Sequence, residues 1–309
     1  MRNAFFKTLV SLAVSDDRIM FLTGDLGFKL FDEFATRFPK RFYNMGVAEQ
    51  NMISVAAGLA LSGKIPFVYS IVPFATARCV EQIRNDLCNM HAPVIVVGVG
   101  GGYAYGENGP THHGIDDIGL MRSLPGMTVV CPCDPREVAD AMVALVGREM
   151  PAYLRLGRAG ERLLPRADRE FVLGRPTIIR RGTNVALVAT GSITSEALTA
   201  ADELVSYGID AEVLSLHTVK PIEEGVVFLL DRGYALVVAI KEHGPCGGMT
   251  EVLTSRLALT ASNVKVVRMC APDHFMHEVA DSSELRCRAG LNATAIVTRV
   301  LAELDVVQC

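Results

Sequence analysis

The sequence lacks the marks of several broad protein classes. No apolar run reaches the roughly 18 residues that a membrane span needs, and the amphipathic start, Asn3 to Val14, has no basic opening and no small-residue cleavage site of a signal peptide. The 30 Lys and Arg residues are scattered, and the net charge is −4, so nothing indicates a polyanion-binding surface. We therefore expect neither a membrane nor a nucleic acid as a partner.

Cysteine chemistry is also sparse. The eight cysteines include no C-x-x-C pair, and several lie inside apolar runs as small hydrophobic residues do, which fits a reducing cytoplasm. Cys131-Pro-Cys133 lacks zinc spacing and partner ligands, so we interpret it as a loop after a strand. Asp273, His274 and His277 suit an ordinary polar loop equally well. We predict no metal ligand on this chain.

The pattern along the chain is that of an α/β protein. With 309 residues, 50% hydrophobic and 21% charged, the chain has the length of about two domains. Short apolar runs alternate with helix-length segments, and because these runs do not alternate with polar residues, they indicate strands buried on both faces in parallel sheets covered by helices. The expected strands are Arg18–Thr23, Ile65–Tyr69, Val94–Val99, Thr128–Val130, Asn184–Thr190, Ala211–Ser215, Ala235–Ile240 and Val264–Met269.

One stretch divides the chain. Residues 157–183 are rich in Arg, Pro and Gly and have no strong periodicity, which is typical of a connection between domains. We predict a first domain over residues 1–165, a linker over 166–183 and a second domain over 184–309.

Two glycine-rich segments resemble nucleotide-binding loops but fail in detail. Gly58 to Lys64 matches G-x-x-x-x-G-K, yet Ile65 stands where a metal-binding hydroxyl is required, so we interpret it as a helix end. Gly98 to Gly102 follows a strand without completing G-x-G-x-x-G, although such a turn can let the main chain approach a ligand. An unrelated nucleotide-binding protein is therefore disfavoured.

The most informative stretch is Gly46 to Met52, which places the carboxylate of Glu49 at the start of an apolar helix. A glutamate in a first turn can be a mere cap, because it complements the helix dipole, or it can be a catalyst. The polar loop Gly106–Gly114 carries His112 and His113, and loops after parallel strands commonly hold the ligand sites of α/β proteins. A surface pair of histidines would have the same signature.

Together these pieces resemble the transketolase family of thiamine-diphosphate enzymes, specifically its pyrimidine-binding and C-terminal domains. The resemblance covers essentially the whole chain, and it implies that residues 1–165 form the pyrimidine-binding domain and residues 184–309 the C-terminal-like domain. Its landmarks follow in order: Gly24–Leu26, Arg41–Met52, Gly58–Ala60, Pro66–Phe74, Gly106–His113, Leu124–Met127, Pro132–Asp134 and Leu154–Arg158.

The resemblance implies a cofactor site. Glu49 matches the carboxylic acid that hydrogen-bonds the pyrimidine ring of thiamine diphosphate. This hydrogen bond drives the tautomerisation on which formation of the C2 carbanion depends. The apolar surroundings of Glu49 suit a carboxyl group that shares a proton. Phe74 matches the aromatic residue that stacks on the pyrimidine. Ile71 stands where transketolases carry another aromatic, and Asp25 belongs to the Gly-Asp-Leu landmark. We predict all four as cofactor-binding residues.

The resemblance also implies a substrate site with altered specificity. His112 matches a histidine that faces substrate oxygens and moves protons, and Arg158 an arginine that holds a phosphate or another anion. His113 replaces the usual Gln, and Asn108 replaces an Asp that contacts a substrate hydroxyl. Gly100–Gly102 replaces a Thr-His-Asp-Ser segment. We predict His112, His113, Asn108 and Arg158 as substrate-binding residues. We also expect a donor or acceptor substrate that differs from the usual sugar phosphates.

The family's magnesium-binding Gly-Asp-Gly is missing, so this chain carries half an active site. The resemblance implies a separate N-terminal subunit that holds the diphosphate and Mg²⁺, in an α2β2 assembly that includes self-association. The expected activity is transfer of a two-carbon ketol unit from a ketose to an aldehyde. Two alternatives stay open: a decarboxylative enzyme, like deoxyxylulose-phosphate synthase or the 2-oxoacid dehydrogenase β chain, and a non-catalytic module that kept the fold.

Overall fold

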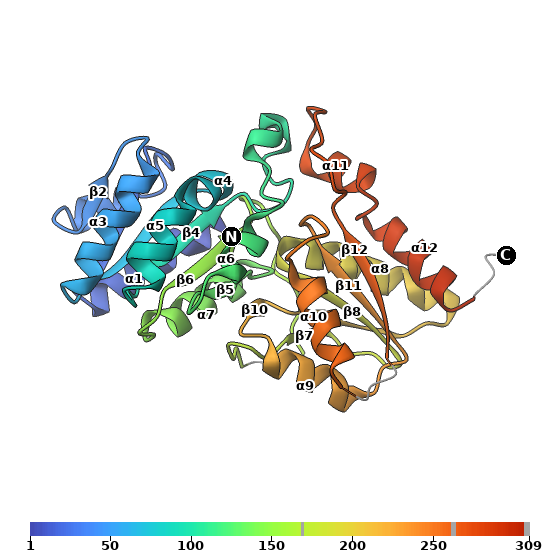
Figure 1. Ribbon diagram of the computed structural model, residues 1–309. Coiled ribbons are helices and arrows are strands. Elements are labelled where there is room, and N and C mark those ends of the chain that lie inside the picture. Colours follow the sequence, from blue (N-terminus) through green and yellow to red (C-terminus); the bar gives the residue numbers. More distant parts are fainter. Residues whose placement is uncertain (168–169, 261–263, 306–309) are drawn as a thin grey trace.

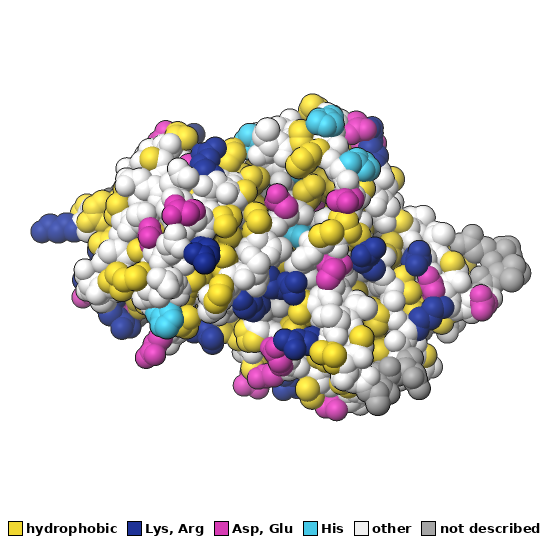
Figure 2. All heavy atoms as spheres, viewed as in Figure 1, with side chains coloured by type: hydrophobic (Ala, Val, Ile, Leu, Met, Phe, Trp, Pro, Cys, Tyr) yellow, Lys and Arg dark blue, Asp and Glu magenta, His cyan; other side chains and the backbone are white. Residues whose placement is uncertain are grey.

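The structure, a computed structural model, describes residues 1–167, 170–260 and 264–305. Two sheets lie side by side, and each is covered by helices (Figure 1). This is the two-domain α/β architecture that the apolar runs predict. Within the described ranges, no helix has the length and apolar content needed to span a bilayer. On the face shown in Figure 2, basic and acidic side chains are interspersed.

The first sheet has seven strands in the order β10-β5-β6-β4-β3-β1-β2. All neighbours pair in parallel except β10, which runs antiparallel to β5. The parallel arrangement brings the carboxyl ends of β1, β3, β4 and β6 to one edge, where the site residues follow. The strands are β1 (Ile19–Thr23), β2 (Phe42–Asn44), β3 (Ile65–Ile71), β4 (Ile95–Val99), β5 (Thr128–Val130), β6 (Ala152–Leu156) and β10 (Thr218–Lys220).

Helices cover both faces of this sheet. On one face, α1 (Arg2–Ser15), α2 (Asp32–Arg37) and α7 (Pro135–Val146) pack onto alternate strand residues in a core that contains Phe5 and Phe21. On the other face, α3 (Glu49–Leu61) and α6 (Asp117–Ser123) bury a second set of apolar side chains. Burial on both faces explains why the strands are uniformly apolar. The short helices α4 (Val72–Ala75) and α5 (Val80–Gln82) follow β3.

The second sheet has five strands in the order β12-β11-β8-β9-β7, and β7 alone pairs antiparallel. Helices α8 and α12 cover one face, while α9 and α10 share the core of the α3 side of the first domain. The elements are β7 (Thr177–Arg180), β8 (Val185–Thr190), α8 (Thr194–Leu204), β9 (Ala211–Ser215), α9 (Glu223–Arg232), β11 (Leu236–Lys241), α10 (Met249–Ala258), β12 (Lys265–Cys270), α11 (Ser282–Arg288) and α12 (Ala293–Glu303).

Among the described residues, the eight expected strands are all present, and four further strands occur that were not expected. β6 escapes the pattern because Arg155 interrupts its apolar run, and the short strands β2 and β10 end in the polar residues Asn44 and Lys220. β7 lies inside residues 166–183, the expected linker, and pairs with β9 at the edge of the second sheet. Strand β10 follows β9 in the chain but joins the first sheet, so the two domains share a strand.

A buried polar network joins the two domains. Arg155 Nε donates to Asp117 Oδ2 at 2.8 Å, and Arg155 Nη2 donates to the carbonyls of Gly114 at 2.6 Å and Glu242 at 3.0 Å. Tyr153 also donates to Asp117, at 2.6 Å. Burial alone would lower the pKa of Arg155, but the neighbouring Asp117 carboxylate outweighs burial, and the pKa is raised. The guanidinium is thus a permanent charge whose donors reach both domains.

His243 is a second buried link between the domains. Its Nε2 accepts the Gly119 N–H at 3.2 Å and its Nδ1 lies 3.0 Å from the Gly244 carbonyl, so this arrangement suits a neutral ring protonated on Nδ1. Burial lowers the pKa of His243 to about 4 from an ordinary value of 6.5.

This lowered pKa predicts a loss of stability in mild acid. Below pH 6.5 the unfolded chain gains a proton at His243, whereas the folded chain gains it only near pH 4. The free energy of unfolding therefore falls by up to roughly 3 kcal/mol as the pH falls from 6.5 to 4. In denaturant titrations at pH 7.5, 6 and 5, the free energy of unfolding of wild type should exceed that of His243→Asn by less and less as the pH falls. The exposed His277→Asn is the control. Parallel curves for wild type and His243→Asn would contradict the neutral buried ring.

Candidate functional site

The carboxyl of Glu49 forms the floor of the site. Glu49 is the first residue of α3 and only 1% exposed, and no side chain caps this helix. Its Oε1 accepts a hydrogen bond from Ser70 Oγ of β3 at 3.0 Å, and its Oε2 accepts one from Arg78 Nη1 at 2.7 Å. A Cβ added at Gly24, after β1, would lie 3.1 Å from Oε1. The carboxyl therefore faces the sheet edge and Arg78, which distinguishes it from a helix cap.

Phe74 and His112 continue the site from Glu49. The Phe74 ring, on α4, lies with its centroid 5.2 Å from that of His112 in an edge-on arrangement. The guanidinium of Arg78 lies 4.3 Å from the Phe74 centroid, so the same side chain contacts both Phe74 and Glu49. Ile71 ends β3 three residues before Phe74 and is half-buried. Three segments far apart in sequence, around Glu49, Phe74 and His112, thus meet in one chain of contacts.

Asp25 lies at the rim. It follows Gly24 with φ of 57°, and its side chain is exposed. Asn44 Nδ2 donates to Asp25 Oδ1 at 2.8 Å, and the Asp25 N–H donates to Asn44 Oδ1 at 3.2 Å. This reciprocal pair ties the turn after β1 to the end of β2.

The loop between Gly102 and Gly114, which we call the histidine loop, carries the other predicted residues. Two backbone hydrogen bonds between these glycines, of 2.8 and 2.9 Å, close its base. His112 is half-buried, with Nδ1 3.0 Å from Thr111 Oγ1, and Asn108 is exposed. Arg158 follows β6 and approaches the same loop, because its Nη1 lies 3.6 Å from Glu107 Oε2.

The structure does not bring His113 to this surface. Its ring is 2% exposed and packs edge-on against Tyr103, with centroids 5.3 Å apart. Its Nε2 lies 3.5 Å from the Gly106 carbonyl, and burial lowers the pKa of His113. His112 and His113 are neighbours on an irregular turn, so their rings point to different sides of the loop.

Arg78 and Ser70 are site residues that the sequence interpretation missed. Ser70 is a polar residue in the apolar run of β3, and Arg78 lies four residues after Phe74, the spacing at which side chains meet on a helical stretch. Those two signals could have placed both residues near the site. Their bonds to Glu49 could not be inferred, because they depend on how β3 packs against α3.

The fold and this cluster define an α/β protein with a buried acid, an aromatic ring and a histidine at the edge of its first sheet. Family models for the transketolase pyrimidine-binding domain and the transketolase C-terminal domain match residues 1–161 and 174–296. The chain belongs to the transketolase family of thiamine-diphosphate enzymes.

Relatives of matching length include two named transketolase subunits. The chain is 36% identical to the 6-deoxy-6-sulfo-D-fructose transketolase subunit of Clostridium sp. (strain MSTE9), over 96% of this chain and 92% of the relative. It is 33% identical to an apulose-4-phosphate transketolase subunit of Phocaeicola vulgatus, over 97% and 96%. A solved split-gene transketolase, described as an inactive β4 tetramer, superposes with a TM-score of 0.86 at 34% identity, over 99% of this chain and 98% of that chain.

Longer relatives match only in part. The 1-deoxy-D-xylulose-5-phosphate synthase of Thermomicrobium roseum is 34% identical over 98% of this chain but only 48% of its own length. The chain therefore spans about half of that enzyme.

The contact between Arg78 and Glu49 predicts energetic coupling. Removing the guanidinium leaves a buried carboxylate with Ser70 as its remaining side-chain donor, so Arg78→Ala should destabilise the chain by about 1–2 kcal/mol at pH 7. In a double-mutant cycle, Arg78→Ala should cost much less in a Glu49→Gln background. Urea unfolding measures each corner. The exposed Arg84→Ala should show no coupling to Glu49, and additive costs for Arg78 and Glu49 would disprove the pair.

Proposed function

We propose that this chain is the C-terminal subunit of a split, thiamine-diphosphate-dependent transketolase, which transfers a two-carbon ketol unit from a ketose to an aldehyde. The observation that carries this proposal is the buried Glu49 carboxyl, turned away from its own helix and connected through Arg78 and Phe74 to His112. The two named subunits of matching length support it.

The residues of the site fit the pyrimidine end of thiamine diphosphate. Glu49 offers a carboxyl oxygen, Phe74 a half-buried ring face and Ile71 an apolar wall, while the glycine at position 24 keeps a side chain away from Glu49 Oε1. Asp25 would hold the turn that carries this glycine. When bound, the cofactor supplies the nucleophilic carbon that accepts the ketol unit. Glu49 would hold or release a proton at its carboxyl, and Phe74 would exclude water.

Substrate contacts are proposed for the loop and its neighbour. His112 borders Phe74 and would transfer protons to and from substrate oxygens. Asn108 is exposed on the same loop, and Arg158 would hold an anionic end of the substrate by paired donors. His113 is left out of the proposed site, because its ring is buried against Tyr103. It would instead stiffen the base of the loop.

The rest of the active site is proposed to lie on a partner. The sequence has no Gly-Asp-Gly, so we place the Mg²⁺ ligands and the diphosphate-binding domain on a separate N-terminal subunit, in an α2β2 assembly. A cytoplasmic setting fits the free thiols of the seven described cysteines, four of them buried.

Reconstitution tests this proposal. The chain alone should bind thiamine diphosphate weakly, and magnesium-dependent binding should appear only after the N-terminal subunit is added, as measured by calorimetry. The assembled pair should transfer ketol units, and Glu49→Gln should lower the rate by about 10³-fold or more without preventing assembly. The exposed Glu81→Gln is the matched control.

Two outcomes would contradict the assignment. Tight cofactor binding by the isolated chain would exclude a divided site. Decarboxylation of 2-oxoacids without ketol transfer would favour the synthase-like chemistry of the longer relatives.

Arg158 allows a separate prediction about the substrate's charge. Because its guanidinium is half-exposed and only loosely paired with Glu107, Arg158→Ala should raise KM for a phosphorylated or otherwise acidic substrate by about 10- to 100-fold. Neutral analogues should be nearly unaffected in the same steady-state assay. Equal effects on both kinds of substrate would make Arg158 a structural residue.

A further inference from the structure

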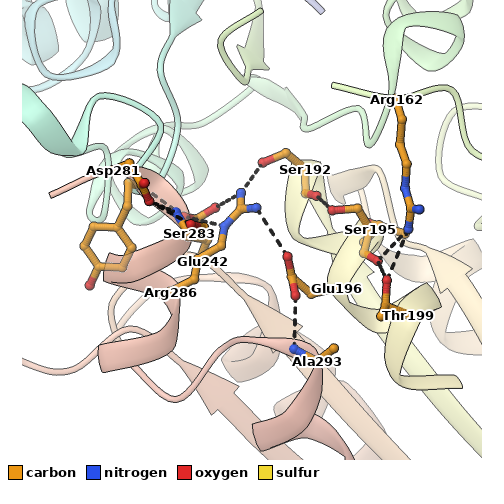
Figure 3. Close-up of polar contacts among 12 residues, drawn as sticks. Arg162, Ser192, Ser195, Glu196, Thr199, Glu242, Asp281, Ser283, Arg286 and Ala293 are labelled. Atoms are coloured by element: carbon orange, nitrogen blue, oxygen red, sulfur yellow. Dashed lines mark hydrogen bonds and ion pairs between the residues drawn. The ribbon is translucent and has the colours of Figure 1, made fainter. Parts of the chain in front are cut away.

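A cavity of about 510 Å³ lies between the two domains. One wall comes from the segment after β6, with Arg158 and Arg162. The opposite wall comes from the second domain, with Ser195 and Thr199 of α8 and Arg286 of α11. We call it the interdomain cavity, and Figure 3 shows Arg162 reaching across it toward Ser195 and Thr199.

The carboxylates on its walls already have partners. Glu161 accepts a hydrogen bond from the Met1 amino group at 2.6 Å. Glu196 Oε2 accepts the Ala293 N–H at 3.0 Å, and its Oε1 lies 4.0 Å from Arg286. Arg286 itself is held by Glu242 through two hydrogen bonds of 2.7 and 3.0 Å (Figure 3). These three charged side chains are therefore compensated within the chain.

One cation on the cavity wall, Arg162, is not compensated in this way. Among the residues that the structure describes, Arg162 has no carboxylate within ion-pair distance. It donates instead to the Ser195 carbonyl and to Thr199 Oγ1, both at the long distance of 3.2 Å. Arg158 is paired with Glu107 at 3.6 Å and lies 5.6 Å from the centroid of the Tyr105 ring, and both of these arginines are exposed. Arg162 therefore brings to the cavity wall a positive charge that no carboxylate of the described residues pairs with.

The position of the cavity in the fold favours a ligand as well. It lies beyond the carboxyl end of β8, whose neighbours are β9 on one side and β11 on the other. At such a reversal of strand order, the loops of a parallel sheet diverge and leave room for a ligand. The eleven-residue α8 begins there, but its first turn also carries Glu196, which offsets the helix dipole, so the positive potential at the cavity comes from Arg162.

We propose that the interdomain cavity is an anion site for a small phosphorylated molecule, with Arg162 as its principal charged donor and Ser195 and Thr199 as polar neighbours. The volume exceeds what inorganic phosphate fills, so an organic phosphate fits it better. The cavity lining does not include His112 or Asn108, although it shares Arg158 with the proposed substrate contacts, and the proposal does not depend on the transketolase chemistry. Because its two walls belong to different domains, a bound anion would bridge them.

Inorganic phosphate and pyrophosphate are suitable probes, added to the full chain without cofactor or partner at constant ionic strength. Both should bind saturably in calorimetry and raise Tm, as any ligand specific to the folded state does. Arg162→Gln should weaken binding about tenfold or more, the scale of a lost charge-assisted hydrogen bond. Thr199→Glu, which places a carboxylate beside Arg162, should abolish binding. The exposed Arg148→Gln, outside the cavity, should bind as wild type does.

The outcomes separate this site from the proposed substrate position. Unchanged binding by Arg162→Gln, or no saturable binding by wild type, overturns the proposal. Loss of binding in Arg158→Ala with full binding in Arg162→Gln also overturns it, because the anion would then sit at the substrate position. Since neither thiamine diphosphate nor a partner is present, failure here leaves the transketolase proposal untouched.

Discussion

The buried guanidinium of Arg155 is the constraint on which the rest of the site depends. A buried charge that loses a partner costs several kcal/mol, so Asp117 and the carbonyls of Gly114 and Glu242 must all stay in place around it. These partners belong to α6, to the base of the histidine loop and to the second domain. One side chain therefore fixes the position of the loop and the contact between the domains together.

The glycines at 100–102 are explained by the same constraint. A Cβ at Gly101 would lie 2.7 Å from Arg155 Cζ, and one at Gly102 would lie 2.4 Å from the Glu242 side chain. Gly102 also pairs with Gly114 and closes the loop that holds His112 against Phe74. The glycines at these positions are thus the residues that the buried network crowds. The absence of side chains at Gly101 and Gly102 leaves room for Arg155 and Glu242.

Sequence patterns predict the parts of this fold that depend on local burial, and miss those that depend on packing between distant segments. The uniform apolar runs identify eight strands, because burial on both faces leaves a local signal, whereas Arg155 hides β6. Glu49, Phe74 and His112 follow from motifs, and the structure brings them together. The pairing of Glu49 with Arg78 and the burial of the His113 ring depend on tertiary contacts. The local sequence pattern does not predict such contacts.

The segment after β6 contacts both domains through its two arginines. Arg158 lies beside Glu107 of the histidine loop, while Arg162 reaches α8 of the second domain. The start of the chain holds this segment from behind, because the Arg2 N–H donates to the Arg158 carbonyl at 3.1 Å and the Met1 amino group binds Glu161. An irregular segment without a helix or strand of its own is therefore fixed by α1. That support from outside allows Arg158 to contact the histidine loop and Arg162 to contact the second domain, while both line the interdomain cavity.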